Sequence, residues 1–138
     1  MTGADQPWAH LIDVDEVLRT YAAAMARYGG LSSPPKVGCV ESSLGAAWNA
    51  EAYAEHPGSP GLLFASCLLF YLAKNHCFAD GNKRISWASA MQVLGMLGLT
   101  VDVSVDDAEA YVLALCANPD AQAADVTRWI AERLTATS

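Results

Sequence analysis

The sequence predicts an all-α fold, a compact bundle of helices around two buried central ones. Hydrophobic residues recur at the 3.6-residue period of a helix through most of the chain, and strand-like alternation is almost absent. Two apolar segments, about 62–73 and 85–97, are hydrophobic nearly all round, which is typical of helices buried in a core. Of the 138 residues, 53% are hydrophobic and 17% charged, which suits one packed domain over residues 1–138 with its core at about 12–134.

The first helix is predicted to follow Asp13. Asp13 and Glu16 stand at the spacing of a capping box, in which each side chain accepts a hydrogen bond from the backbone N–H of the other residue. Apolar residues then recur at helical spacing until Gly29, which ends the helix. The two ends of the chain, roughly 1–11 and 135–138, are expected to be loose tails.

The next segment is predicted to be mostly loop. Residues 31–40 contain turn-forming serines, prolines and a glycine, so we expect a loop that leaves room for a small flap hairpin. A short helix at about 40–49 follows, and the breaker-rich segment 56–61 separates it from the first central helix.

Short elements complete the predicted fold after the central helices. Residues 99–103 alternate like a short strand or an extended connector, and Ser104 is placed to cap a helix that runs to about Ala117. A last helix is predicted at about 121–134. The residues expected to face the core from these two helices are Val105, Ala108, Val112, Leu115, Val126, Trp129 and Ile130.

The charge of the chain restricts its partners. The formal net charge is −7, and nucleic acids and anionic membranes are both bound through many basic side chains, so neither is expected as a partner. Lys74, Lys83 and Arg84 nevertheless form a local positive cluster, which suits a small anionic ligand.

Cysteine usage and the absence of targeting signals predict a cytoplasmic protein. The cysteines are widely spaced without a C-x-x-C pair, so free thiols in a reducing compartment are expected at Cys39, Cys67, Cys77 and Cys116, with disulfides or a zinc site as the less favoured alternative. The N-terminus lacks the pattern of a signal peptide, and the longest apolar run, 62–73, is too short to span a bilayer.

The segment 75–84 interrupts the apolar pattern with polar and charged residues between two helices predicted to be buried. His76 is its only candidate general base, since an imidazole titrates near neutral pH. Asp80 supplies a carboxylate of the kind that binds Mg²⁺ together with phosphate oxygens. If the second central helix begins near Gly81, its free N–H groups and positive dipole end form an anion site beside the base.

Asn82, Lys83 and Arg84 extend this predicted anion site. Cations in the first turn oppose the helix dipole by roughly 0.3–1 kcal/mol each, and a bound polyanion offsets that cost. Phe78 is expected to anchor the loop in the core. Each residue taken alone also fits a structural role, such as capping the helix or lying on the solvated surface. Their combination in one short segment indicates a site for a nucleotide's phosphates.

At these residues the chain resembles the Fic/Doc superfamily. The segment from His76 to Arg84, HCFADGNKR, matches every fixed position of the central motif of that superfamily. AMP-transferring members typically have a proline at the position of Cys77, a glycine at that of Lys83 and a second arginine at that of Trp87. The Asn-Lys-Arg version without that arginine is similar to the Doc (death on curing) branch of toxins.

This resemblance implies a kinase that uses ATP and Mg²⁺ and delivers the γ-phosphate to a hydroxyl of a target protein, with translation elongation factor Tu as the known kind of target. It implies that His76 deprotonates that hydroxyl and that Asp80 holds Mg²⁺. The residues that it assigns to phosphate binding are Gly81, Asn82, Lys83 and Arg84.

The resemblance also implies a partner. Self-inhibited Fic proteins carry an inhibitory helix motif that this sequence lacks, so restraint is expected from a separate antitoxin with a disordered tail that folds onto the toxin. The sequence leaves two alternatives open. One is an AMP transferase that uses the same His76, and the other is a catalytically inactive binding module with the Fic fold.

Overall fold

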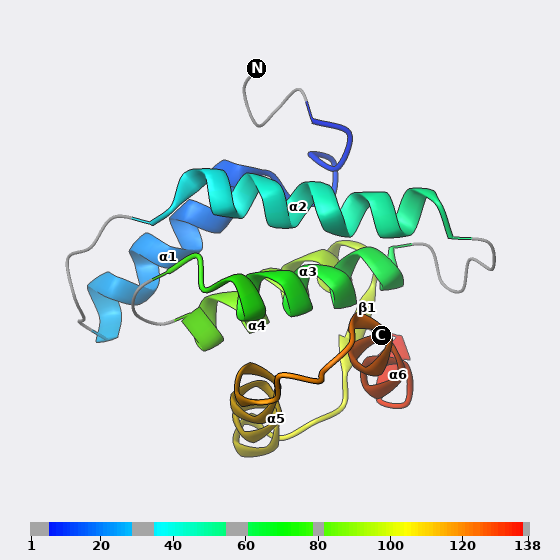
Figure 1. Ribbon diagram of the computed structural model, residues 1–138. Coiled ribbons are helices and arrows are strands. Elements are labelled where there is room, and N and C mark those ends of the chain that lie inside the picture. The colour runs from blue at the N-terminus through cyan, green and yellow to red at the C-terminus, as the bar shows by residue number, and fades with distance from the viewer. Residues whose placement is uncertain (1–5, 29–34, 55–60, 79–81, 137–138) are drawn as a thin grey trace.

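The computed structural model describes residues 6–28, 35–54, 61–78 and 82–136, with only the backbone described for Tyr28 and Asn82 (Figure 1). Helices dominate these residues and strands are limited to one small sheet, which confirms the predicted all-α class. In chain order the elements are α1 (Val14–Tyr28), α2 (Val37–Ala52), α3 (Leu62–Asn75), α4 (Asn82–Met96), β1 (Leu99–Val101), α5 (Val105–Ala117), α6 (Ala123–Ala131) and β2 (Leu134–Ala136).

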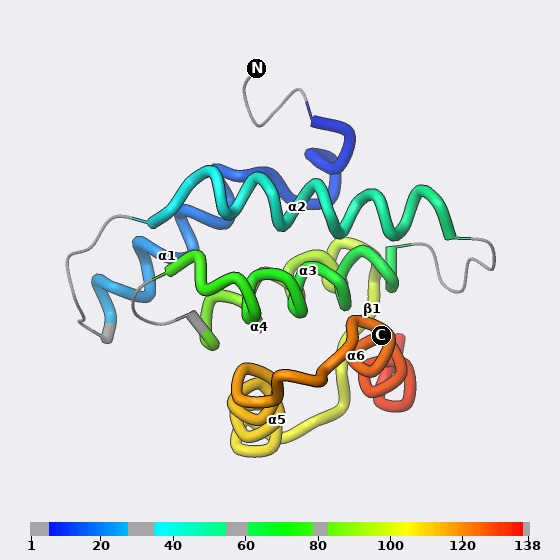
Figure 2. Tube along the Cα trace, viewed as in Figure 1, coloured from blue at the N-terminus to red at the C-terminus, as the bar shows by residue number. Residues whose placement is uncertain are grey.

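The helices form three stacked pairs. Figures 1 and 2 show α1 and α2 on one side of α3 and α4, and α5 and α6 on the other side. α3 is the centre of the fold, because it packs against α2, α4, α5 and α6. Its side chains are buried on nearly all sides, as predicted, and the largest of those that are fully enclosed are Phe64, Leu68, Leu69 and Leu72.

The capping box predicted from Asp13 and Glu16 at the start of α1 is confirmed. The backbone N–H of Glu16 donates to the Asp13 carboxylate at 2.7 Å, and the backbone N–H of Asp13 donates to the Glu16 carboxylate at 3.1 Å. The segment before the helix is not the loose tail that we expected, because Trp8 is buried and packs over Gly45 of α2. An indole buries a large apolar area, and this burial holds the described part of the N-terminal segment against the bundle.

α2 is longer than predicted at both ends. Residues 37–40, which we expected to be loop, form its first turn, and the helix continues to Ala52 instead of ending near residue 49. Contacts with neighbouring segments hold both extensions, since the backbone N–H of Lys36 donates to the Cys77 carbonyl before the first turn, and the Glu51 carboxylate in the last turn accepts hydrogen bonds from the start of α3. The flap was predicted within residues 31–40, of which residues 37–40 are helical and residues 31–34 are outside the described part of the chain.

The start of α3 is capped by a side chain from another helix. The Glu51 carboxylate of α2 accepts hydrogen bonds from the backbone N–H groups of Gly61 at 2.6 Å and Phe64 at 3.2 Å. Gly61 has a positive φ of 87°, and a Cβ at this position would collide with the Leu97 side chain. A carboxylate of the protein itself therefore interacts with the positive end of the α3 dipole.

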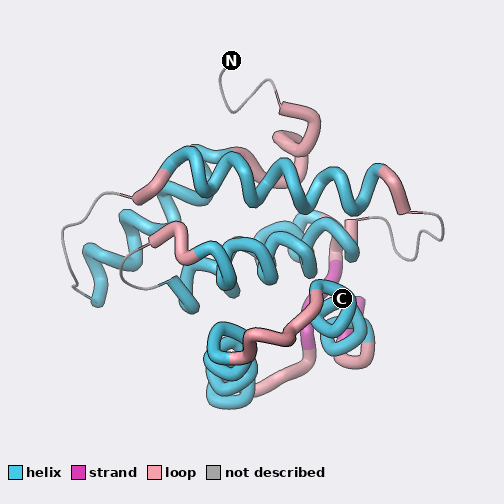
Figure 3. Tube along the Cα trace, viewed as in Figure 1, coloured by secondary structure: helices cyan, strands magenta, loops and turns pink. Residues whose placement is uncertain are grey.

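The last third of the described chain contains the small sheet. β1 pairs antiparallel with β2, with Leu99 opposite Ala136 and Val101 opposite Leu134, as Figure 3 shows in magenta. The predicted strand at 99–103 is therefore confirmed in its first three residues, whereas the predicted tail is wrong for residues 135 and 136, which belong to β2. A sheet between segments this far apart in sequence leaves no local signal, so the C-terminal strand was missed.

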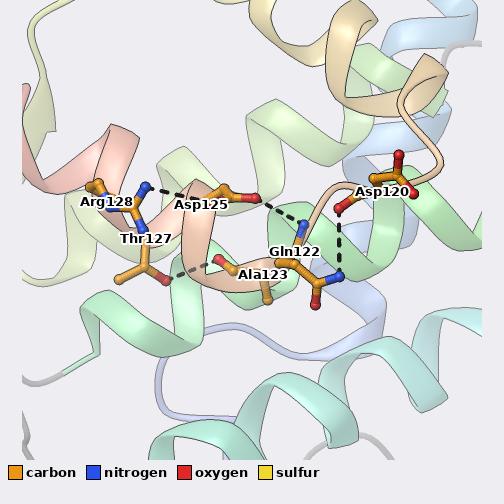
Figure 4. Close-up of polar contacts among 6 residues, drawn as sticks. All are labelled: Asp120, Gln122, Ala123, Asp125, Thr127 and Arg128. Atoms are coloured by element: carbon orange, nitrogen blue, oxygen red, sulfur yellow. Dashed lines mark hydrogen bonds and ion pairs between the residues drawn. The ribbon is translucent and has the colours of Figure 1, made fainter.

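Of the two helices between these strands, α5 has the predicted cap, whereas no cap was predicted for α6, which ends at Ala131 and not near Leu134 as expected because Leu134 begins β2. The Ser104 hydroxyl accepts from the backbone N–H of Asp107 at 3.1 Å at the start of α5. Gln122 and Asp125 form a reciprocal capping box at the start of α6, part of which Figure 4 shows. Val105 was expected in the core but is 82% exposed, because it is the first residue of α5 and lies beyond the edge of the core.

None of the described helices combines the length and the apolar character that crossing a bilayer requires.

Candidate active site

His76 terminates α3 in an unusual backbone conformation. It is the C-cap residue of α3, with φ 51° and ψ 53°, and its side chain is exposed. Among the described non-glycine residues it alone has a positive φ. The left-handed region costs a residue with a Cβ roughly 1–2 kcal/mol, so contacts on both sides of His76 must hold it there.

Those contacts follow immediately in the chain. Phe78 is 1% exposed and stacks on Tyr21 of α1, with ring centroids 5.0 Å apart and an interplanar angle of 19°. The Cys77 carbonyl accepts a hydrogen bond from the backbone N–H of Lys36 at 3.1 Å. The loop after His76 is therefore anchored to α1 and to the start of α2.

A disulfide bond adds a covalent anchor at the same place. Cys39, in the first turn of α2, is bonded to Cys77, with the two Cα atoms 5.4 Å apart. The prediction of four free thiols is therefore wrong for this pair, although it holds for Cys67 and Cys116. The two bonded residues are separated by 38 positions, and only the packing of α2 beside the end of α3 brings them together.

Two polar residues complete the junction between α2 and α3. The Asn75 side chain donates from Nδ2 to the hydroxyl of Ser43, which is fully buried, at 3.1 Å. The Ser43 oxygen also lies 3.7 Å from the Cys77 sulfur. Sequence reasoning missed Cys39 and Ser43 as neighbours of His76. The one available signal was the cysteine at the motif's usual proline position.

The next helix begins a few residues further on. α4 starts at Asn82, as predicted, and its first turn contains no acidic residue, while Lys83 and Arg84 lie there with exposed side chains. The first backbone N–H groups of a helix have no partner within it, and the dipole places a partial positive charge at that end. This terminus is therefore electrostatically suited to an anion. Asp80 and Gly81 are outside the described residues, and so is the side chain of Asn82.

The ends of several elements meet around this loop. Figure 1 shows the C-terminal end of α3 beside the N-terminal end of α2 at one end of the bundle, and the disulfide joins the two. α4 packs against both α3 and α1. The exposed imidazole of His76 thus lies at the end of the bundle, seven residues before Lys83, the first cation of α4, in the sequence.

Lys74 of the predicted positive cluster also holds the end of another helix. Its Nζ donates to the carbonyl oxygens of Leu115 at 3.2 Å and Asn118 at 2.6 Å, so it caps the C-terminal end of α5. Burial raises the pKa of the Cys116 thiol, and the positive charges of Lys83 and Lys74 partly offset that rise. The charge of Lys83 therefore reaches the end of α5 as well.

Trp87 lies away from the loop. Its ring meets that of Trp129 edge to face at 6.1 Å, and it lines a cavity of about 450 Å³ between α4, β1 and α5. None of the described residues from 76 to 84 lines that cavity. Within the described ranges, no three His, Cys, Asp or Glu side chains are grouped closely enough to hold a metal ion.

Comparison with known proteins bears on the same residues. A family model described as the Fic/DOC family matches residues 11–94, which include α1 to α3, most of α4 and the loop after His76. One curated relative is the toxin Doc of Mycolicibacterium smegmatis, which is 49% identical over 47 residues. That match covers 33% of this chain and 36% of the relative, so the chain spans about a third of the relative's length.

Proposed function

Because the chain belongs to the Fic/DOC family, on its Doc branch, we propose that it acts as the toxin of a toxin–antitoxin pair. In this proposal it is a protein-modifying enzyme that transfers the γ-phosphoryl group of ATP to a hydroxyl of a target protein. The observation that carries the proposal is the exposed His76, held in a left-handed conformation just before the N-terminus of α4.

His76 is the general base of the proposed reaction. Its imidazole takes the proton of the target hydroxyl, and the freed oxygen attacks the γ-phosphorus. The bond to the oxygen that bridges the β- and γ-phosphates breaks, and ADP leaves. Phe78 and the Cys39–Cys77 bond hold the backbone next to this base, so the imidazole is oriented without a large entropy cost at each turnover.

The start of α4 stabilises the phosphates. Negative charge accumulates on the transferred group during phosphoryl transfer, and preorganised donors and cations lower its energy. Lys83 and Arg84 supply the cations, and the residues assigned to this role by the motif are Gly81, Asn82, Lys83 and Arg84.

Mg²⁺ fits the same site by the chemistry of its donors. Mg²⁺ binds through one or two carboxylates together with substrate phosphates, and Asp80 is the carboxylate that the motif offers. When bound, the ion neutralises phosphate charge.

Position 87 favours phosphoryl transfer over AMP transfer. The AMP-transferring relatives that this sequence resembles have an arginine there, whereas Trp87 packs on Trp129 and presents no charge. Loss of that cation and gain of Lys83 change the distribution of positive charge around the phosphates. AMP transfer by the same His76 remains the second candidate, and an inactive binding module is the third.

The proposed partners are a target protein and an antitoxin. A translation factor such as elongation factor Tu is the proposed target, which places the reaction in the cytoplasm. The antitoxin is a separate protein that restrains the toxin. The net charge of −7 makes nucleic acid an unsuitable partner.

The test is transfer of label from ATP that carries radioactive phosphorus at either the α or the γ position. We expect γ-label on a hydroxyl of elongation factor Tu, and a loss of about a hundredfold or more in the His76→Ala variant, because its base is missing. His10→Ala is the matched control, since His10 is also exposed but is hydrogen-bonded to the Pro7 carbonyl away from the loop. Label from the α position would instead identify an AMP transferase.

A further inference from the structure

We propose that Cys39 and Cys77 form a reversible thiol–disulfide modification site that controls how firmly the backbone at His76 is held. The site is distinct from the phosphate-binding residues, although its link to catalysis rests on the proposed function. The bond joins the first turn of α2 to the residue directly after His76.

The disulfide ties the residue that follows the strained His76 to α2, which is held firmly by the core. Val40, Leu44 and Ala47 are fully buried and fix α2 against the core, so Cys39 is a stationary attachment point. His76 directly precedes Cys77, the second cysteine of the bond, and the left-handed conformation of His76 costs free energy. The covalent link therefore restricts the relaxation of His76 toward the more common backbone regions.

Both oxidation states fit the same surroundings. The Cys39 sulfur lies 3.8 Å from the carbonyl oxygen of Asn75, and the Cys77 sulfur lies 3.7 Å from the hydroxyl of Ser43. After reduction, each thiol has an acceptor for its proton within reach, and Ser43 is itself held by Asn75. The dithiol form therefore keeps a polar neighbour at each sulfur, which suits a reversible site.

Access to the bond is one-sided. Cys39 is partly exposed and Cys77 is fully buried, so a reductant reaches the sulfur of Cys39. The thiolate of a dithiol reductant attacks that sulfur, and the Cys77 sulfur leaves as a thiolate and takes up a proton. The second thiolate of the reductant then attacks its own sulfur in the mixed disulfide and releases Cys39. The products are two protein thiols and the cyclic disulfide of the reductant, and a disulfide oxidant reverses the reaction.

The other two cysteines are poor competitors for this exchange. Cys67 is 2% exposed, and burial, with a smaller contribution from the negative charge of Glu51, raises its pKa to about 11. Burial also raises the pKa of Cys116. Thiolates are the reacting species, so both residues react slowly with oxidants at neutral pH. The modification is therefore directed to the pair beside His76.

The form with the Cys39–Cys77 disulfide therefore catalyses transfer faster than the reduced form. Reduction leaves the Lys36–Cys77 hydrogen bond and the Phe78–Tyr21 stack as the anchors that follow His76. In a reducing cytoplasm the pair is expected to be mostly open, and oxidising conditions close it. Closing the pair preorganises the base, so the transfer rate rises with oxidation.

The experiment compares the full chain after treatment with oxidised glutathione and after treatment with dithiothreitol. Peptide mapping without reductant is expected to find Cys39 and Cys77 cross-linked only in the first sample. Hydrogen–deuterium exchange of the peptide that contains residues 74–78 is expected to be slower there. Transfer of γ-label is expected to be roughly fivefold to tenfold faster, because the reduced form must regain the left-handed conformation.

Two variants separate this effect from general redox sensitivity. Cys39→Ser is expected to exchange and transfer like the reduced wild type under both treatments. The double variant Cys67→Ser, Cys116→Ser keeps the pair, and it is expected to retain the difference between the two treatments.

Two results would overturn the inference: no Cys39–Cys77 cross-link after oxidation, or equal exchange in both oxidation states. If exchange responds to oxidation but no label is transferred in either state, the proposed function fails while the modification site stands.

Discussion

The N-terminal ends of α3 and α4 receive their electrostatic partners from different sources. At α3, the Glu51 carboxylate accepts hydrogen bonds from two backbone N–H groups, of Gly61 and Phe64. At α4, the first turn contains no acid and places Lys83 and Arg84 beside the positive end of the dipole. The first terminus is completed by the fold, whereas the second favours an anion that the protein does not supply from that turn. Carboxylate removal at α3 should thus affect stability, and changes at α4 should affect transfer.

The largest effect is expected from Arg84→Gln. Removal of a cation that contacts the developing charge lowers the transfer rate by about a hundredfold or more. Arg84 is exposed, and an exposed polar interaction contributes at most about 1 kcal/mol, so the free energy of unfolding should fall by no more than that amount. Label transfer and urea unfolding measure the two quantities. Arg19→Gln, an exposed arginine of α1, is the control and should leave both unchanged. Equal transfer by the Arg84 variant and wild type would contradict the assignment.

Glu51→Gln tests the other terminus. The neutral amide keeps the shape of the side chain but has only one acceptor oxygen. One of the two hydrogen bonds is therefore lost and the other is no longer charge-assisted, and the expected loss is about 1–3 kcal/mol of unfolding free energy. The transfer rate of the folded enzyme should stay near that of wild type. Urea unfolding at neutral pH gives the stability, with Glu41→Gln, an exposed glutamate of the same helix, as control. A loss no larger than that of the control would refute the capping role.

The two termini also show what the sequence could and could not predict. The start of α4, the Asp13–Glu16 box and the Ser104 cap were all predicted, because each depends on residues within a few positions. The Glu51 cap of α3 was not, because its acceptor comes from another helix, ten residues before Gly61.

Long-range pairs account for the remaining differences. The Cys39–Cys77 bond, the β1–β2 sheet and the contacts of Lys74 with the end of α5 all join segments more than thirty residues apart in sequence. None of them leaves a periodic or local signal, and each depends on how the helices pack. The motif identified His76 because its residues are contiguous, but it carried no information about what holds His76 in place.

The pH dependence of stability tests how strongly the negative charge of Glu51 acts on the thiol of Cys67, a residue of α3. Burial, followed by the charge of Glu51, raises the pKa of Cys67 from 9.0 to about 11, which favours the neutral thiol in the folded chain. The stabilisation is complete below the unfolded pKa near 9.0 and is lost as pH rises through about 11. Between pH 8 and pH 10, wild type should therefore lose about 1 kcal/mol more than Cys67→Ala in urea unfolding. When both chains also carry Glu51→Gln, the difference in stability loss between them should become smaller. An unchanged difference would show that the charge of Glu51 does not raise the pKa of Cys67.

The smallest change in stability is expected from a substitution that gives the N-terminal end of α4 an acidic residue, as Glu51 provides at the N-terminal end of α3. Lys83→Glu places an acid in the first turn, where it interacts favourably with the dipole, and the free energy of unfolding should rise by about 0.3–1 kcal/mol. The same change repels phosphate, so transfer should fall while stability rises. Lys36→Glu, which alters an exposed lysine at the N-cap of α2, is the control for added charge at a helix start and should lower transfer much less. If Lys83→Glu instead lowered stability, the first turn of α4 would already have its anion within the fold, and the contrast between the two helix ends would disappear.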